Sequence, residues 1–471
     1  MPGTTADLDR TPALDARQGL AKLATYPFQI LTFVDRDGYP VSVAVKATIE
    51  PERGTATLTA PAGFGIPDGT EVSLTGSHIH PQPGYGYDER RHVTVWGRAA
   101  SAAGDGSLTL AAARAWGWDE AELPFFEYSE RSLGQSRRYF DALSAERGTP
   151  VKPRLSFGWL ALRTTRLPFL SATIVPVVLG IAIAARNGSF DLLTAVLTVI
   201  GAACVQLGLN VANDVFDASL GADDANVTPT KFSGGSRVIQ YGLVSFRQMA
   251  GLATGFYVAA GLIGLLLLAL RGSPALLAIG IVGFIVSIGY TAPPLKFVYR
   301  GLGEIAVAIG FGPLMLLGAY VVQTRGAISW EPIVASLPIA LLVSLILYVN
   351  EIPDRRGDAR AGKRTLPVRL PKPTVIAGYR LAAIAAYAIL VLGVIVGLLP
   401  IPALLALLSI PLALQVSRGL EPNYDNPYGL MAVMGVNVKV HLYAGLLLLA
   451  GYLVVLVAGA LVPSVSLFVG R

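Results

Sequence analysis

The chain has 471 residues, of which 53% are hydrophobic and only 14% are charged, with a net charge of +6. Soluble globular proteins carry roughly 25% charged residues, so this composition excludes an ordinary soluble protein and indicates lipid around much of the chain. Residues 1–153 hold 15 of the 37 Lys and Arg and 19 of the 31 Asp and Glu, a net charge of −4, and the remainder carries +10. An acidic soluble part therefore precedes a basic, apolar part. Its basic residues lie between apolar segments, which favours anionic headgroups or phosphates over nucleic acid as partners.

The N-terminal part shows the pattern of a small all-β domain. Asp37-Gly38 is a hairpin signal, and alternating apolar residues surround it. The expected strands are Gln29–Val34, Tyr39–Ile49, Thr55–Ala60, Glu71–Ile79, Arg91–Ala100 and Ser107–Ala113. Short strands at this spacing favour a closed barrel or a sandwich, followed by a helix over Glu130–Glu146. We expect a flexible N-terminus over 1–20, a barrel domain over 21–146, a linker over 147–160 and a membrane domain over 161–471.

From Leu167 onward, apolar runs are long enough to cross a bilayer core, which takes about 20 helical residues. Nine spans are expected, at 167–186, 191–212, 248–270, 274–291, 303–322, 332–350, 376–399, 401–417 and 440–463. The single cysteine, Cys204, lies in one of these runs and excludes a disulfide framework within the chain. Its expected role is that of a small buried apolar residue.

The distribution of basic residues predicts the orientation. Seventeen Lys and Arg flank the nine spans on the side of the N-terminus, and four flank them on the other side. Cytoplasmic loops carry the excess of basic residues, so we expect the N-terminal domain and the Asp-rich span ends in the cytoplasm. The first thirty residues show no basic segment followed by an apolar one, so no cleavable signal peptide is expected.

Carboxylates gather at the cytoplasmic ends of the second and sixth spans. Asn210, Asp214 and Asp217 fall at i, i+4 and i+7, on one helical face, with Asn213 between them and Asp223 following. The sixth span ends similarly, with Asn350, Asp354 and Asp358 at i, i+4 and i+8, and Pro353 is expected to kink it. Carboxylates in a span are expensive, which makes them functional candidates, and the two sets are expected to meet at one cavity.

Such sets suit magnesium, which is held by a few carboxylates together with phosphate oxygens of a substrate. A diphosphate bridged by two ions would leave readily, because the metal acts as a Lewis acid. Candidate groups for the remaining phosphate oxygens lie in the same loops: Lys231, Arg237, Lys363 and Arg364, with Gly234-Gly235 allowing close approach of backbone N–H groups. Tyr290 and Tyr348 are candidates for stabilising an allylic cation.

These motifs resemble the UbiA superfamily of intramembrane prenyltransferases, over about residues 155–465. The matching segments are 213–223, 228–237, 290–304 and 354–370. The resemblance implies an all-α polytopic membrane domain of nine transmembrane helices around a central cavity. Two Mg²⁺ would be held by Asp214, Asp217, Asp223, Asp354 and Asp358, with a lipid-facing opening for the polyprenyl tail. Segments 213–223 and 299–304 are most similar to the dihydroxynaphthoate branch of menaquinone biosynthesis, which implies a polyprenyl diphosphate and an aromatic acceptor as substrates. A homo-oligomer is left open.

Residues 20–145 are similar to the pyridoxamine 5′-phosphate oxidase-like split barrels, which often bind FMN. The hairpin at Phe33–Pro40 and the strand Val93–Ala99 carry the similarity. Candidate phosphate ligands are Lys46, Arg90 and Arg91, and a solvated barrel surface explains them equally well. His78, His80 and His92 are expected on exposed strand faces. The sequence therefore does not identify the residues of a cofactor site.

Other functions remain open on the sequence. The acceptor could be a glycerol phosphate, a sugar phosphate or a tetrapyrrole. The protein could be a flavin oxidoreductase tethered by its helices, or a cation-coupled carrier. A carrier would place its carboxylates near the bilayer midplane, whereas here they lie at the span ends.

Overall fold

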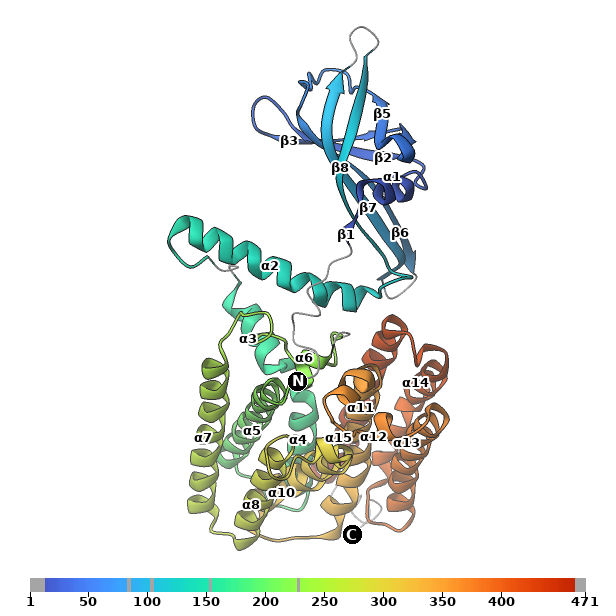
Figure 1. Ribbon diagram of the computed structural model, residues 1–471. Helices are drawn as coiled ribbons and strands as arrows, with labels where there is room; N and C mark the ends of the chain where they lie inside the picture. Colours follow the sequence, from blue (N-terminus) through green and yellow to red (C-terminus); the bar gives the residue numbers. More distant parts are fainter. Residues whose placement is uncertain (1–12, 83–85, 102–105, 152–154, 227–228, 462–471) are drawn as a thin grey trace. The chain divides into compact units, whose positions relative to one another are not determined.

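The computed structural model describes residues 13–82, 86–101, 106–151, 155–226 and 229–461. The chain divides into two compact units, with the boundary between Pro150 and Val151. The first unit contains a curved antiparallel sheet, two α-helices and the short 3₁₀ helix η2 Pro51–Arg53, and the second contains only helices (Figure 1).

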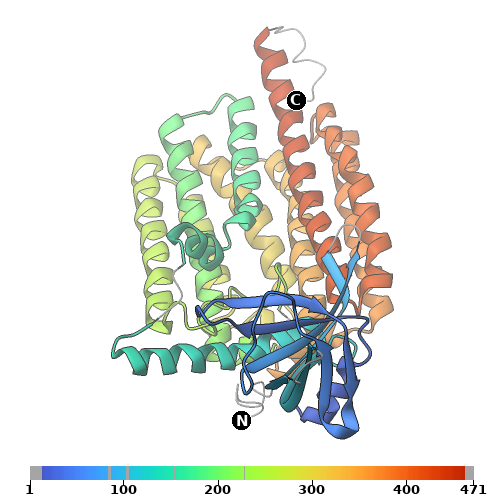
Figure 2. The ribbon, with the colours of Figure 1, turned by 90° about the horizontal axis from the view of Figure 1, so that it is seen from above.

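The sheet of the first unit has the order β3-β2-β6-β7-β8-β5-β4, with β1 paired to β8. Its strands are β1 Ala13–Leu14, β2 Gln29–Val34, β3 Pro40–Val45, β4 Ala47–Glu50, β5 Thr55–Thr59, β6 Glu71–Gln82, β7 Gly86–Ser101 and β8 Ser107–Asp119. The two edge strands, β3 and β4, are joined by Lys46 alone, so the sheet must curl until its edges approach each other. This partly open barrel fits the expected split-barrel domain (Figure 2).

Alternating residues of these strands form the core of the barrel, among them Leu31, Leu74, Val95 and Leu110. Helix α1, Ala16–Leu23, adds Leu20 and Leu23 to the same core. The expectation of a flexible segment over 1–20 is therefore wrong from Ala13 onward, because β1 and α1 are part of the domain; residues 1–12 lie outside the described part. The expected strand Tyr39–Ile49 is two strands, and α2, Phe125–Arg147, starts earlier than the expected helix.

The second unit packs its helices side by side, with α4 against α10 and α15, α5 against α7, and α11 against α13 (Figures 1 and 2). Its longer helices are α3 Phe157–Thr165, α4 Ser171–Arg186, α5 Leu192–Ser219, α7 Phe246–Arg271, α8 Pro274–Gly289, α9 Gly303–Ile309, α10 Met315–Thr324, α11 Trp330–Arg360, α13 Lys372–Ile395, α14 Ile410–Asn423 and α15 Pro427–Leu461. The short ones are η3 Leu167–Leu170, α6 Ala222–Ala225, η4 Val298–Arg300, η5 Gly310–Leu314, α12 Leu366–Arg369 and η6 Ile401–Ser409.

Eight helical segments among the described residues are long and apolar enough to cross a membrane. They correspond to eight of the nine expected spans, and the remaining one is α8, a shorter apolar helix of 16 residues. The two spans that carry the Asp-rich motifs are longer than expected, because α5 continues to Ser219 and α11 to Arg360, and the last helix, α15, already begins at Pro427. The chain is thus an integral membrane protein whose Asp-rich motifs lie within helices rather than in the loops after them.

Gly180 allows α4 and α10 to approach closely. A Cβ atom at this position would lie 2.2 Å from the backbone oxygen of Leu316, a contact that requires the helices to separate. We predict that Gly180→Ala lowers the free energy of unfolding by about 1–3 kcal/mol, the usual range for overpacking. The midpoint of thermal unfolding in detergent would fall accordingly.

Gly255→Ala in α7 is the matched control, because no atom lies within 4 Å of the added Cβ. Its midpoint should be unchanged or slightly higher, since Ala favours helix over Gly. Equal midpoints for the two variants would show that the close approach of α4 and α10 is not needed for stability.

Candidate active site

The first set of carboxylates lies on the last turns of α5 and on the short helix that follows. The helix extends through Asp214 and Asp217 because no Gly or Pro interrupts it after Gly208. Gly221 then adopts a φ of 75°, which a side chain would disfavour, and turns the chain into α6 with Asp223. Asp214, Asp217 and Asp223 are only 2%, 4% and 4% exposed. The three carboxylates are therefore buried together, where ionisation requires compensating partners.

The second set lies on α11. This helix continues through Pro353, so that Glu351, Asp354 and Asp358 share one face at i, i+3 and i+7. Glu351 and Asp358 are buried, and Asp354 is half-buried. Both sets are thus presented by regular helices, which fixes their spacing.

Lys363 joins the two sets. Its Nζ lies 3.2 Å from Asp217 Oδ2 and 3.8 Å from Asp358 Oδ1. Burial alone would lower the pKa of Lys363, but these two carboxylates raise it well above its ordinary value, so the ammonium stays charged. Asp217 also accepts hydrogen bonds from Tyr299 Oη at 2.7 Å and from Asn213 Nδ2 at 3.2 Å. Residues far apart in the sequence therefore converge on Asp217.

The loop after α6 closes the site by donating backbone N–H groups to carboxylates. Gly234 N donates to Asp354 Oδ2 at 2.9 Å, and Ser236 N donates to Asp214 Oδ2 at 3.1 Å. Gly235 has a φ of 74°, and a Cβ there would lie 2.9 Å from Asp223 Oδ1. Only glycine leaves room for the loop to lie so close to the carboxylates.

A cavity of about 170 Å³ lies between the two sets. Its charged lining residues are Asp217, Asp223, Glu351, Asp354 and Asp358, against Arg166 and Lys363. Burial, followed by the neighbouring Asp217 and Asp214 carboxylates, raises the pKa of Asp223 well above its ordinary value. The cavity thus carries more carboxylates than cationic side chains, an arrangement suited to binding cations.

A second, larger cavity of about 530 Å³ is lined almost entirely by apolar residues of α5, α7, α8, α9 and α10. It shares five lining residues with the first cavity: Gln206, Leu209, Tyr290, Val307 and Phe311. The acidic cavity therefore adjoins an apolar one, with Tyr290 at the boundary.

The structure brings together most of the residues expected at the site. The first cavity is lined by Asn210, Asn213, Asp217, Asp223, Tyr290, Asp354, Asp358 and Lys363. Asp214 lies beside it, in an ion pair with Arg166. Arg237 is buried and donates to the backbone oxygen of Asp223.

Three expected residues lie elsewhere. The side chains of Lys231 and Arg364 are exposed and do not line the cavity. Tyr348 is buried in the core between α11 and α13, where its hydroxyl donates to the backbone oxygen of Val375 at 2.9 Å. Their predicted roles in substrate binding have no support from their positions.

Several residues at the site were not assigned from the sequence. Arg166 pairs with Asp214, Tyr299 contacts Asp217, and Asn226 Nδ2 donates to Asp354 Oδ1 at 2.9 Å. Tyr299 lies in a segment that carried the family resemblance, which was the one available signal for it. The spacing of Arg166 and Asn226 in the sequence does not indicate a role at the site, because only the tertiary fold brings them to the carboxylates.

The candidate cofactor ligands of the first unit do not form a phosphate site. Arg90 is held by Glu120, with Nη2 2.9 Å from Glu120 Oε1, and its guanidinium lies 3.6 Å from the ring centre of Phe125. Lys46 and Arg91 are exposed. Among the described residues of this unit, a flavin site is therefore not shown.

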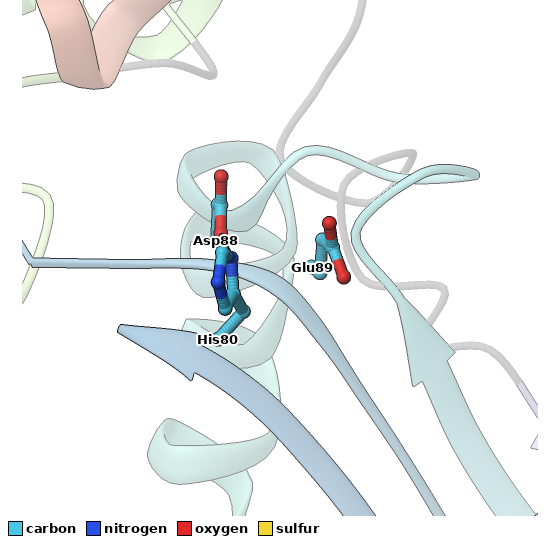
Figure 3. Close-up of side chains that lie close together, drawn as sticks. All are labelled: His80, Asp88 and Glu89. Carbon is cyan, nitrogen blue, oxygen red and sulfur yellow. Dashed lines mark hydrogen bonds and ion pairs between the residues drawn. The ribbon is translucent and has the colours of Figure 1, made fainter. Parts of the chain in front are cut away.

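The histidines of the first unit have two different environments. His80 Nδ1 lies 2.9 Å from Asp88 Oδ1, with Glu89 beside them, on the surface of the β6–β7 hairpin (Figure 3). His92, expected on an exposed face, instead packs against the ring of Trp116 with 4.7 Å between centroids, and burial lowers its pKa. The exposed group has the ligand types for a metal ion, but nothing else among the described residues of the hairpin points to one.

Three curated proteins illustrate the similarity of this chain to known sequences. It is 27% identical to a 2-carboxy-1,4-naphthoquinone phytyltransferase of Synechocystis, over 62% of this chain and 92% of the relative. It is 28% identical to the 1,4-dihydroxy-2-naphthoate octaprenyltransferase of Bacillus subtilis, over 65% and 96%. With the Escherichia coli protein of that same description, the identity is 30%, over 62% and 94%.

The matched region lies within the helical unit and contains both sets of carboxylates. Residues 173–434, more than half of the chain, match the UbiA prenyltransferase family. This chain therefore belongs to the UbiA prenyltransferase family.

Proposed function

We propose that the protein transfers a polyprenyl group from a prenyl diphosphate to an aromatic acceptor of the naphthoate type, in the biosynthesis of a menaquinone-like quinone. The observation that carries this proposal is the acidic cavity joined to a large apolar cavity at Tyr290. A prenyl diphosphate has the matching division into a charged head and an apolar chain. The relatives named for naphthoate prenyl transfer support the choice of acceptor.

The donor set fits magnesium. Asp217, Asp223 and Asp358 offer buried carboxylate oxygens around one cavity and Asp354 a half-buried one, the ligand type that Mg²⁺ prefers, with Asp214 beside them. Bound magnesium would stabilise the leaving diphosphate as a Lewis acid. Asn213, on the same helix, orients the first set through its hydrogen bond to Asp217, whereas Asn210 donates to the backbone oxygen of Thr165.

The cationic residues of the cavity bind the diphosphate. Lys363 carries a stable positive charge and has more than one carboxylate partner, so its ammonium is held at the mouth of the cavity. Arg166 orients Asp214. Arg237 positions α6 through the backbone of Asp223 and does not line the cavity.

The apolar cavity holds the prenyl chain and keeps water from the allylic carbon, which would otherwise be hydrolysed. Tyr290 lies where the chain and the diphosphate meet, so its ring is placed to stabilise positive charge on that carbon. Tyr348 is too deep in the core for this role.

In the membrane, we place α8 as a ninth crossing helix, so that the helices surround a central cavity that contains both lined spaces. The basic loops put the N-terminal unit and the site at the cytoplasmic side of the cell membrane. The carboxylates then face the compartment that contains soluble diphosphates and magnesium. Carriers hold their ions near the bilayer midplane, and the helix-end position of these carboxylates argues against that function.

We predict that Asp217→Asn and Asp354→Asn each reduce prenyl transfer by at least about 10²-fold, because each removes a charge from the metal-binding set while keeping the side-chain shape. The measurement is product formation from geranylgeranyl diphosphate and 1,4-dihydroxy-2-naphthoate in detergent with Mg²⁺. Asp224→Asn is the control, since Asp224 adjoins Asp223 but does not line the cavity. Near-normal turnover in both test variants would refute the proposed site.

The two lysines expected to bind phosphate should behave differently. Lys363→Ala is predicted to lower kcat/KM for the prenyl diphosphate by about 10-fold or more, because a buried charge-assisted contact contributes about 1.5–3 kcal/mol. Lys231→Ala should change it less than about threefold, because this side chain is exposed and outside the cavity. A larger loss for Lys231→Ala would show that its loop closes over the substrate.

The apolar cavity should select the length of the prenyl chain. Gly283 lines it, and no atom lies within 4 Å of a Cβ added there, so the side chain of Gly283→Leu has room to start and would fill space in the cavity. We expect a higher KM for geranylgeranyl diphosphate and little change for dimethylallyl diphosphate. Gly255→Leu, which points away from both cavities, should affect neither substrate.

A further inference from the structure

A pair of buried glutamates lies at the acidic cavity and has no part in the function described above. Glu351, on α11, is 5% exposed, and Glu304, at the start of α9, is 7% exposed. The two carboxyl groups are close enough to interact electrostatically. Two carboxylates that lie close together in a buried place disfavour each other's ionisation.

Glu351 is directed at the substrate space. It lines the acidic cavity, and neither of its carboxylate oxygens has a hydrogen-bond partner among the described residues. A buried carboxylate without partners is costly, which indicates that a ligand supplies the missing donor. Glu304 does not line the cavity, so it supports Glu351 from behind.

The position of Glu351 separates it from the metal-binding set. It precedes Asp354 by three residues on the same helical face, roughly 4.5 Å further into the span. There the cavity wall is apolar, with Phe311, Ile346 and Leu347. An apolar slot with one carboxylate at its edge fits a flat aromatic ring that carries a hydroxyl group. Diphosphate, by contrast, would be repelled by Glu351.

We propose that Glu351, supported by Glu304, is the group that binds and activates the acceptor. Its carboxylate accepts the hydrogen bond of an acceptor hydroxyl and takes that proton as the ring carbon attacks. This inference rests on the proposed prenyl transfer and adds to it the acceptor class, an aromatic ring with a hydroxyl group conjugated to the attacking carbon.

The step balances as follows. The C–O bond of the prenyl diphosphate breaks, and the diphosphate leaves with the electron pair. Ring π electrons form the new C–C bond, while the hydroxyl electrons form a C=O bond as the proton moves to Glu351. The neutral dienone avoids a charged ring in an apolar cavity. When the ring carbon then loses its proton to the diphosphate, the oxygen regains one from Glu351 and the aromatic ring is restored.

Two variants of equal shape test this assignment. Glu351→Gln removes the proton acceptor and is expected to lower kcat for 1,4-dihydroxy-2-naphthoate by about 10²-fold or more, the usual contribution of a general base. Glu304→Gln keeps a donor for Glu351, so its loss should stay below about tenfold. A purely structural pair would be harmed equally by either substitution, and equal losses would overturn the proposal.

Binding of the other substrate serves as the folding control. Affinity for the non-ionising analogue geranyl thiodiphosphate with Mg²⁺ should change less than threefold in Glu351→Gln, which shows that the variant is folded and its metal site intact. Should it fail this control, Glu351→Asp is used instead and should keep measurable transfer with a reduced kcat. Loss of analogue binding in both variants would reassign Glu351 to the diphosphate site and overturn the proposal.

Acceptors that lack one hydroxyl complete the test. With 1-hydroxy-2-naphthoate and 4-hydroxy-2-naphthoate, the ratio of wild-type to Glu351→Gln turnover should fall towards one for the acceptor that lacks the contacted hydroxyl. An unchanged ratio for both acceptors would overturn the assignment while leaving prenyl transfer intact. Absence of any prenylated product with the wild-type protein would instead refute the proposed function itself.

Discussion

The contacts of Lys363 with Asp217 and Asp358 are the interaction on which the site depends. They connect the end of α5 to the end of α11. Buried carboxylates repel each other, and a single ammonium between them offsets part of that repulsion. The fold can therefore hold an acidic cavity before any metal ion enters. The Lys363 ammonium that makes this possible must later be shared between these carboxylates and the substrate.

The same constraint explains the loop between α6 and α7. Its backbone N–H groups at Gly234 and Ser236 donate to one carboxylate from each set. Backbone donors bring no net charge and no flexible side chain, so they stabilise carboxylates without competing for a cation. Glycine at 235 is required by this close approach, since a Cβ would meet the Asp223 carboxylate. The loop is thus part of the site although it contributes few side chains to it.

The helical periodicity of the sequence predicted those parts of the site that lie on one helix. The spacing of Asn210, Asp214 and Asp217 places them on one face whatever the rest of the fold does, and the basic loops gave a consistent topology. Which lysine reaches the cavity could not be read in this way, because Lys231 and Lys363 both follow an Asp-rich span end. The difference arises from tertiary structure: one is exposed, and the other is drawn between carboxylates.

The limits of pattern reading are equally physical elsewhere. The predicted span boundaries were wrong where one helix has an apolar part and a polar part, as α11 (Trp330–Arg360) does. The apolar run of such a helix ends before the helix itself ends. Arg166 and Asn226 became visible only when the fold closed around Asp214 and Asp354. A helix determines the spacing of residues that are near in the sequence, whereas the tertiary fold determines which residues become the partners of a buried charge.

The carboxylates of α11 lie along a gradient of polarity that relates their different surroundings to their different roles. From Asp358 through Asp354 to Glu351 the same helical face passes from the basic loop to an apolar slot. Carboxylates at the outer end are compensated by Lys363 and the loop, and suit cations and diphosphate. The innermost carboxylate, Glu351, has only the carboxyl group of Glu304 behind it. Its oxygens can therefore still accept a hydrogen bond from a donor. One helix thereby separates the charged part of a reaction from the part that must stay dry, because each turn deeper into the span raises the cost of an unpaired charge.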